Sequence, residues 1–273
     1  MTNISTLTNP LSLTIEGLLV QIKRICTAQD ISFFIAGATA REILLHHVHG
    51  RRVGRRTRDI DIAVFVDGWQ RFDELKNAFL AQDAQVVRNN AHRIVVAGIE
   101  VDIIPFGAIA EDNQIAWPPD RKIIMYVDGF DEAFRHTVQV RLDNGETLPF
   151  CSLAGLALLK LFAWRDRRFG NAKDAVDFYN IVREYGAIED DRIYEPPVEG
   201  ERLGWDPVRM GAALLGYDVA TMYQEGSPAE LTFLDKECLI DAIVRQSVAD
   251  NSVEIEQLIN AFWSSVVTAV EES

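Results

Sequence analysis

The sequence predicts an α+β protein: a head with a small mixed β-sheet and flanking helices over residues 1–148, followed by an α-helical bundle over residues 149–273. In the first half, short runs rich in β-branched and aromatic residues alternate with segments of helical period. After residue 148, apolar residues recur at steps of three and four almost to the end, which is typical of packed helices. The mixing of strands and helices in the head indicates one main sheet.

The elements of the head follow from the same two periods. Gly98 lies in a predicted tight turn between two strands, and Asn144-Gly145 lies in a predicted hairpin turn. Gly50 is the expected residue after a helix end. The predicted order is a helix over 13–28, a strand over 31–37, a helix over 38–49, a strand over 58–68, a helix over 71–83, strands over 92–98 and 100–107, and a hairpin over 138–150.

The second half reads as a series of helices with one interruption. An acidic, proline-containing loop separates the second predicted helix from the third. Aromatic residues within these helices are expected in the core rather than on a base-stacking surface, as for Phe162, Trp164, Phe178 and Tyr179. The predicted helices cover 152–167, 172–186, 206–224, 237–248 and 253–270, and the loop covers 187–206.

Composition excludes several classes of protein. The chain has 273 residues and a formal net charge of −14, which argues against general binding to DNA or RNA, because phosphate binding needs cationic side chains. Its three cysteines are widely spaced and form no C-x-x-C pair, as expected in a reducing compartment. We expect a cytoplasmic protein, since the N-terminus lacks a secretion-signal pattern and no apolar run is long enough for a membrane span.

Three aspartates interrupt two apolar strands of the head. Asp59 and Asp61 are separated by one residue, so they point to the same face of their strand. Adjacent carboxylates repel one another unless water, a cationic side chain or a metal ion compensates them. For the pair alone, the simpler interpretation is two exposed acids at a strand edge, paired with Arg56 or Arg58. Asp102 interrupts a second strand in the same way, and if the strands are neighbours the three carboxylates suit a hard cation such as Mg²⁺.

A glycine turn precedes these acids. The strand that ends in FIAG runs directly into a helix at Gly37-Ala38. Backbone N–H groups at such a turn, with the positive end of the helix dipole, favour binding of phosphate. A phosphate site beside a carboxylate triad is typical of metal-assisted transfer of a phosphoryl-type group.

These motifs together resemble a known family. Gly37-Ala38, the stretch RTRDID at 56–61 and VDIIP at 101–105 are similar to the catalytic head of the polymerase-β-type nucleotidyltransferases. Within that superfamily the chain most resembles the AbiEii toxin-type group, which includes the MenT-type toxins. LLKLFAWRDR followed by NAKDAVDF is similar to that group's helical region, with Lys160, Lys173, Asp174 and Asp177 at the matching positions. The chain departs from the family's Gly-Gly or Gly-Ser at Gly37-Ala38.

The resemblance implies a reaction and its partners. Asp59 and Asp61 are expected to bind two Mg²⁺ ions that bridge the triphosphate of an NTP, and Asp102 to complete the site. An acceptor hydroxyl would then attack the α-phosphate and release pyrophosphate. The acceptor could be a tRNA 3′ end, a protein hydroxyl or a small molecule such as an aminoglycoside. A cognate antitoxin is a further expected partner. The alternative is a catalytically silent nucleotide- or partner-binding module that retains the fold.

Basic residues of the head have two interpretations each. Thr57 and Arg58 either contact the triphosphate or belong to an ordinary extended segment, and Arg41 either faces the phosphates or lies on the surface. The arginines between 51 and 58 either recruit a polyanionic acceptor or form a solvated loop. This arginine group comprises Arg51, Arg52, Arg55, Arg56 and Arg58.

The helical region contributes a lysine and two acids. Lys160 lies in an otherwise apolar helix, so it either extends along the surface or points into a cleft toward phosphate or Asp174. The resemblance favours the cleft for Lys160 and Asp174, whereas Asp177 is expected to cap or bridge the bundle. His46, His47 and His49 are not expected to form a zinc site, because adjacent residues on a helix diverge by roughly a hundred degrees.

Overall fold

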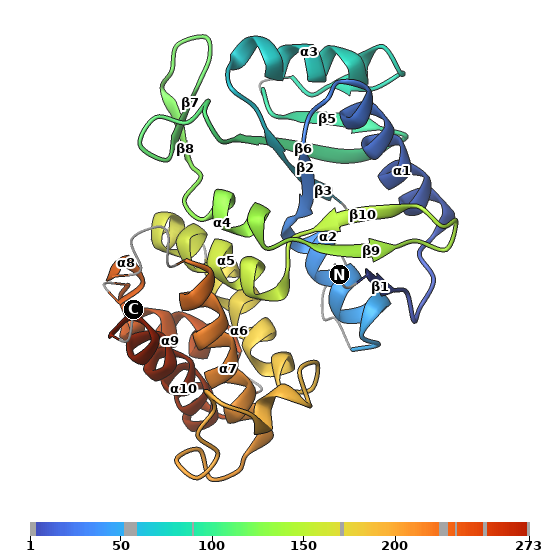
Figure 1. The fold of residues 1–273 in the computed structure, drawn as a ribbon. Helices are drawn as coiled ribbons and strands as arrows, with labels where there is room; N and C mark the ends of the chain where they lie inside the picture. Colours follow the sequence, from blue (N-terminus) through green and yellow to red (C-terminus); the bar gives the residue numbers. More distant parts are fainter. Residues whose placement is uncertain are drawn as a thin grey trace. The chain divides into compact units, whose positions relative to one another are not determined.

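The computed structural model describes residues 4–51, 59–88, 90–169, 172–223, 229–232, 234–247 and 250–271. The chain divides into two compact units, residues 1–152 and residues 153–273. The predicted boundary after residue 148 falls within the last strand of unit 1. The predicted fold class is confirmed, because a mixed sheet with flanking helices precedes a helical bundle (Figure 1).

In the described part of unit 1, eight strands form one mixed sheet in the order β1-β9-β10-β2-β3-β6-β5-β4. The neighbours β2 and β3 are antiparallel, β3 and β6 are parallel, and β6 and β5 are antiparallel. The sheet is larger than predicted because β1 and β4 join its two edges. The strands are β1 (Ile4–Thr6), β2 (Phe33–Ala36), β3 (Asp59–Phe65), β4 (Gln85–Val86), β5 (Arg93–Val96), β6 (Ile99–Phe106), β9 (Val138–Arg141) and β10 (Thr147–Phe150).

Local sequence explains the central strands. In β3, Ile60, Ile62 and Val64 are buried, as the alternation predicts. The turn between β5 and β6 consists of Ala97 and Gly98, both with positive φ (51° and 80°), which matches the twist of a two-residue hairpin. The predicted strands and hairpins of the head are therefore confirmed.

The helices of unit 1 flank this sheet. Ser12 caps α1 by accepting a hydrogen bond from the Ile15 N–H at 3.3 Å. The helix predicted over 38–49 is present but not uniform, because its second half is a π-helical segment, η1. Its C-terminus is held from outside, since Thr8 Oγ1 donates to the Val48 carbonyl at 2.6 Å. The helices are α1 (Leu13–Ala28), α2 (Gly37–Glu42), η1 (Ile43–Val48), α3 (Trp69–Leu80) and α4 (Phe130–Arg135).

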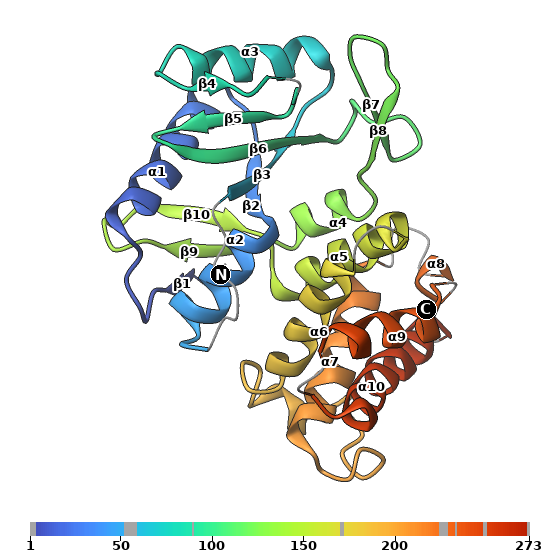
Figure 2. The ribbon, with the colours of Figure 1, turned by 180° about the vertical axis from the view of Figure 1, so that it is seen from behind.

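A second, two-stranded sheet in unit 1 was not predicted. It consists of β7 (Gln114–Trp117) and β8 (Ile123–Tyr126), and in both views the hairpin stands apart from the main sheet (Figures 1 and 2). Trp117 is buried against the α3 residues Trp69 and Phe72, with ring centroids 5.2 and 5.5 Å away. Aromatic contacts of Trp117 thus anchor the hairpin to α3.

In the described part of unit 2 the regular secondary structure is all helical, and the predicted loop over 187–206 carries only one short helical turn. The predicted core aromatics are buried, and the Phe178 ring meets the Phe262 ring edge-on with centroids 5.0 Å apart. Asp206 caps α7 by accepting from the N–H groups of Val208 and Arg209. No helix in the described ranges combines the length and apolar character needed to cross a bilayer. The helices are α5 (Leu153–Arg167), α6 (Lys173–Tyr185), η2 (Arg192–Tyr194), α7 (Pro207–Met222), α8 (Ala229–Thr232), α9 (Lys236–Gln246) and α10 (Ser252–Glu271).

Candidate active site

Two parallel strands bring the predicted aspartates together. In the register of β3 and β6, Asp61 lies opposite Asp102 and Asp59 lies opposite Glu100. Directly opposed residues of neighbouring strands project to the same face of the sheet, so four acids share that face. We call Asp59, Asp61, Glu100 and Asp102 the carboxylate cluster. The side chains of Asp59 and Glu100 are 40% and 49% exposed and that of Asp102 only 11%, so the cluster opens to solvent on the Asp59 side.

The glycine turn lies directly against this cluster. Ala36, the last residue of β2, is opposite Asp61, and Gly37 follows with a φ of +62°. A Cβ atom at position 37 would come within 1.8 Å of Asp61 Oδ2, so a residue with a side chain cannot occupy that place without displacing the carboxylate. Two residues later, Thr39 Oγ1 donates to the Asp59 carbonyl at 2.6 Å. Helix α2 is therefore fixed to β3 at both aspartates.

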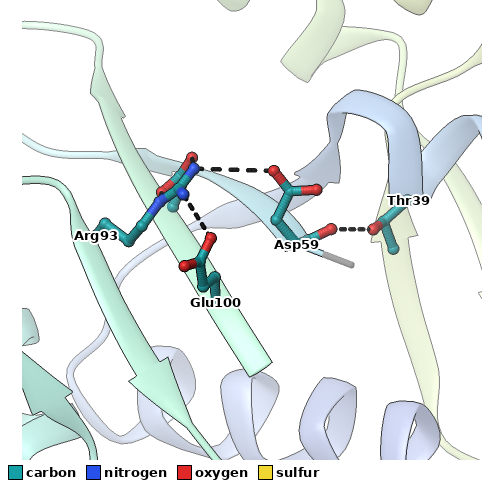
Figure 3. A network of polar contacts seen from close by, with 5 residues as sticks. Thr39, Asp59, Arg93 and Glu100 are labelled. Atoms are coloured by element: carbon teal, nitrogen blue, oxygen red, sulfur yellow. Dashed lines mark hydrogen bonds and ion pairs between the residues drawn. The ribbon is translucent and has the colours of Figure 1, made fainter. Parts of the chain in front are cut away.

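An arginine that was not predicted binds the cluster. From β5, Arg93 donates from Nε to Asp102 Oδ1 and from Nη2 to Asp102 Oδ2, each at 2.6 Å. The same guanidinium lies 2.5 Å from Glu100 and 3.8 Å from Asp59, and Figure 3 shows its contacts with both acids. The hydrogen bonds to Asp102 raise the pKa of Arg93 above its ordinary value, so it stays charged. One fixed cation thus offsets part of the repulsion among the carboxylates.

The carboxylate cluster has the oxygen ligands of a site for a hard cation, but they are not arranged as a preformed metal site. Carboxylate oxygens on adjacent strands are the ligands that Mg²⁺ and Mn²⁺ prefer. Within the ranges that the structure describes, however, no three His, Cys, Asp or Glu side chains form a ready-made metal cage. Both oxygens of Asp102 are engaged by Arg93. The residues therefore fit divalent ions by type and position, with Asp102 held in an ion pair.

The remaining predicted residues of the head have mixed outcomes. Ala38 is half-buried beside the glycine turn. The surface alternative for Arg41 is wrong, because this residue is only 6% exposed on the inner side of α2. Thr57 and Arg58, with the other arginines at 52, 55 and 56, lie outside the described residues.

The histidines of η1 have structural partners. His46 Nδ1 lies 3.1 Å from the Arg51 carbonyl, and His47 Nδ1 lies 3.0 Å from the Asn9 carbonyl. The two rings therefore hold separate backbone segments, one at the end of η1 and one after β1. Both histidines therefore have structural roles: His46 holds the backbone after η1, and His47 holds the N-terminal segment.

In unit 2, Lys160 forms a buried ion cluster with two acids. Its Nζ lies 2.9 Å from Asp174 Oδ1 and 2.9 Å from Asp177 Oδ2, and the two carboxylates are 5% and 9% exposed. Burial alone would lower the pKa of Lys160, but the attraction of Asp177 and Asp174 outweighs it and raises that pKa. The surface alternative for Lys160 is wrong, because its side chain is 16% exposed. Asp177 bridges the bundle as expected.

A further arginine joins this ion cluster. Arg167, which was not predicted, donates from Nη2 to Asp174 Oδ2 at 2.8 Å. Two cations of α5, Lys160 and Arg167, thus form ion pairs with Asp174. Lys173, the other matching position of the motif, is exposed at the start of α6. Of the motif residues, Lys160 of α5 therefore contacts Asp174 and Asp177 of α6 within unit 2.

Replacing Gly37 by alanine should damage the carboxylate cluster more than the fold. An alanine at this φ costs about 1–2 kcal/mol in any setting. At position 37 its Cβ also displaces Asp61. We expect Gly37→Ala to bind divalent ions much more weakly, measured by Mn²⁺ titration followed by electron paramagnetic resonance. Gly50→Ala is the matched control, because Gly50 has a φ of +64° and open space around a Cβ. Equal metal binding by the two variants would show that Asp61 is not held against the turn.

Comparisons with known proteins give low similarity. No family model matches the chain, and no curated protein sequence matches it. The antibiotic-resistance factor ANT(2'')-Ia is 14% identical, with a TM-score of 0.41 over 79% of this chain and 98% of that one. A nucleotidyltransferase-like protein from Paracoccidioides brasiliensis is 15% identical, with a TM-score of 0.43 over 92% and 95%. A CCA-adding enzyme in complex with CTP is 12% identical, with a TM-score of 0.37 over 96% and 53%.

Proposed function

We propose that this chain is a nucleotidyltransferase that moves a nucleoside monophosphate from an NTP to a hydroxyl acceptor. The observation that supports this most directly is the register of β3 and β6, which places Asp61 opposite Asp102 on the face that carries Asp59. The close packing of Asp61 against Gly37 also supports the proposal, because it puts a candidate phosphate-binding turn beside the acids. A phosphoryl-type transfer needs both elements.

The carboxylate cluster supplies the ligands for divalent ions. Asp59, Asp61 and Asp102 would hold Mg²⁺, and the ions when bound would offset negative charge on the triphosphate and on the attacking oxygen. The chain's own residues position the acids: β3 aligns Asp59 and Asp61, and Thr39 fixes the backbone of Asp59. In the transfer, the acceptor oxygen forms a bond to the α-phosphorus. The bond between the α-phosphorus and the oxygen that bridges it to the β-phosphate breaks. Pyrophosphate leaves, and the hydroxyl proton passes to Asp102 or to water.

Phosphate binding is assigned to the glycine turn and the residues around it. The backbone N–H groups at Gly37 and Ala38 would face the triphosphate, with Thr57 and Arg58 as further candidate ligands. Arg41 is buried in α2, the helix that begins at this turn. Its positive charge would favour binding of an anion such as phosphate there. ATP is the first NTP to test.

The proposal extends to a narrower class. The motifs at 37–38, 56–61, 101–105 and 160–177 support a toxin-type nucleotidyltransferase of the AbiEii and MenT kind, acting on a tRNA 3′ end. A cognate antitoxin would then be the natural protein partner. The matching helical motif is intact, since Lys160 and Asp174 lie 2.9 Å apart. Protein hydroxyls and aminoglycosides are the competing acceptors.

Labelled NTPs separate these possibilities. The chain is incubated with each α-³²P NTP and Mg²⁺, together with total tRNA, a protein extract or an aminoglycoside, and the products are resolved by size. We expect label in one acceptor class, lost when Asp59 or Asp102 is replaced by asparagine. The proposal would be contradicted by the absence of labelled product with every acceptor when metal and nucleotide are shown to be bound.

One observation favours a silent module instead. Arg93 already holds both oxygens of Asp102, as expected of a site that has exchanged its metal for a permanent ion pair. Such a module would bind nucleotide or a protein partner without turnover. Its nucleotide affinity, measured by calorimetry, would then be indifferent to Asp59→Asn and Asp102→Asn.

A further inference from the structure

Arg93 occupies acids that the proposed reaction uses as metal ligands. Its guanidinium touches Asp102 at 2.6 Å through two separate nitrogens and also reaches Glu100 and Asp59. Three of the four acids of the carboxylate cluster therefore contact one fixed cation. Asp102, which is the most buried of the three, has the strongest contact, because a two-point bond between arginine and carboxylate is both directional and charge-assisted.

We propose that Arg93 is a built-in counter-ion that competes with divalent metal for Asp102 and thereby sets the metal affinity of the site. This inference rests on the proposed function, since it assumes that the carboxylate cluster binds metal. Arg93 acts through Asp102 and is a positioning residue rather than a catalytic one.

The competition follows from geometry. Both Asp102 oxygens accept hydrogen bonds from one planar group, so a metal ion can use either oxygen only by sharing it with the guanidinium or by breaking one bond. The side chain of Asp102 has little room to turn elsewhere, because it is 11% exposed and packed in β6 between β3 and β5. Two cations close to one carboxylate also repel each other. Each therefore lowers the affinity of the other, and this coupling is reciprocal.

The acids at the open end behave differently. Asp59 lies 3.8 Å from Arg93 and is 40% exposed, so its contact with the guanidinium is weaker than that of Asp102. Asp61 lies against the Gly37 turn. It shares β3 with Asp59 and is opposite Asp102 on β6. We therefore expect metal and NTP to be captured first at Asp59 and Asp61. Recruitment of Asp102 would follow only as Arg93 gives up part of its bond.

The same type of ion pair in unit 2 offers a contrast. Arg192 binds Asp218 through Nη1 at 3.0 Å and Nη2 at 2.7 Å, a geometry close to that of Arg93. Asp218 also accepts a hydrogen bond from Tyr185 at 2.6 Å and lies on a helix. In the described residues Arg192 pairs with Asp218 and Glu189, and neither acid belongs to the carboxylate cluster. Arg192→Met is therefore a matched control that breaks a comparable ion pair away from the carboxylate cluster.

Metal affinity tests the inference without an activity assay. Mn²⁺ is titrated into the full chain in the presence of a non-hydrolysable ATP analogue, and free Mn²⁺ is followed by electron paramagnetic resonance. We expect Arg93→Met to bind Mn²⁺ about tenfold more tightly than the parent, because a competing cation is gone. The melting temperature of Arg93→Met should fall without metal and rise on Mn²⁺ addition by more than that of the parent. Arg192→Met should lose stability without any change in Mn²⁺ affinity.

The outcomes separate this inference from the proposed function. Mn²⁺ binding by the parent, with equal or weaker binding by Arg93→Met, would overturn the role of Arg93 and leave the metal site standing. No Mn²⁺ binding by either protein would contradict both. Binding by Arg93→Met alone would support the competition. If Arg93→Met does not fold, Arg93→Lys replaces it. Lysine keeps the positive charge but loses the two-point bond to Asp102. Arg93→Lys is then expected to bind Mn²⁺ more tightly than the parent, and equal or weaker binding would overturn the role of Arg93.

Discussion

Replacing Asp61 by asparagine is expected to reduce nucleotidyl transfer by about a hundredfold or more while leaving the fold intact. Asparagine has nearly the same size, so it fits the space beside Gly37 that an added Cβ would fill. It lacks the negative charge that a divalent ion requires at the position opposite Asp102. The initial rate of label transfer from NTP measures the effect, and circular dichroism reports the fold.

The control for Asp61→Asn is an aspartate of similar chemistry outside the site. Asp143 is exposed in the turn between β9 and β10, so Asp143→Asn should transfer label at the parental rate. If Asp61→Asn were as active as Asp143→Asn, the carboxylate cluster would not be the reaction centre.

Replacing Lys160 by methionine is expected to lower the free energy of unfolding by about 3–5 kcal/mol, because two buried carboxylates lose their shared cation. Asp174 and Asp177 are 5% and 9% exposed, so water does not replace the ammonium readily. Urea unfolding followed by tryptophan fluorescence measures the loss. Lys122→Met is the control, because Lys122 is 81% exposed and its removal should leave the unfolding midpoint unchanged. Equal midpoints for the two variants would contradict a buried ion cluster.

The effect of Lys160 should depend on pH in one direction. Its pKa is raised in the folded state, so its contribution to stability is fully present below the ordinary lysine value of 10.5. The contribution is lost as pH rises through the raised pKa. The difference in unfolding free energy between parent and Lys160→Met should therefore be constant from neutral pH to about pH 10 and shrink above that value.

Much of the candidate site could be predicted because it depends on local patterns. The alternation of β3 places Asp59 and Asp61 on one face, and Asp102 is an acid within the otherwise apolar VDIIP stretch of β6. That β3 and β6 are direct neighbours does not follow from any local pattern, because it depends on how the chain crosses between them. The contact of Gly37 with Asp61 likewise depends on the pairing of β2 with β3.

Arg93 was missed although the sequence holds the signal for it. A two-residue turn at Ala97 and Gly98 fixes the hairpin register, and counting outward from it pairs Arg93 with Asp102. Glu100 could be found in the same way, since it is two residues before Asp102 on the same face. The burial of Arg41 had no such signal, because the face that a short helix buries is decided by distant parts of the chain.

A crystal structure with Mn²⁺ and a non-hydrolysable NTP tests the metal-binding role of the carboxylate cluster most directly. Anomalous scattering locates Mn²⁺ without relying on neighbouring atoms. We predict Mn²⁺ peaks between the side chains of β3 and β6, bound by Asp59 and Asp61 and shared with Asp102, and phosphate oxygens at the Gly37 turn. A nucleotide bound elsewhere, with no Mn²⁺ on these aspartates and Arg93 still holding both oxygens of Asp102, would contradict the assignment.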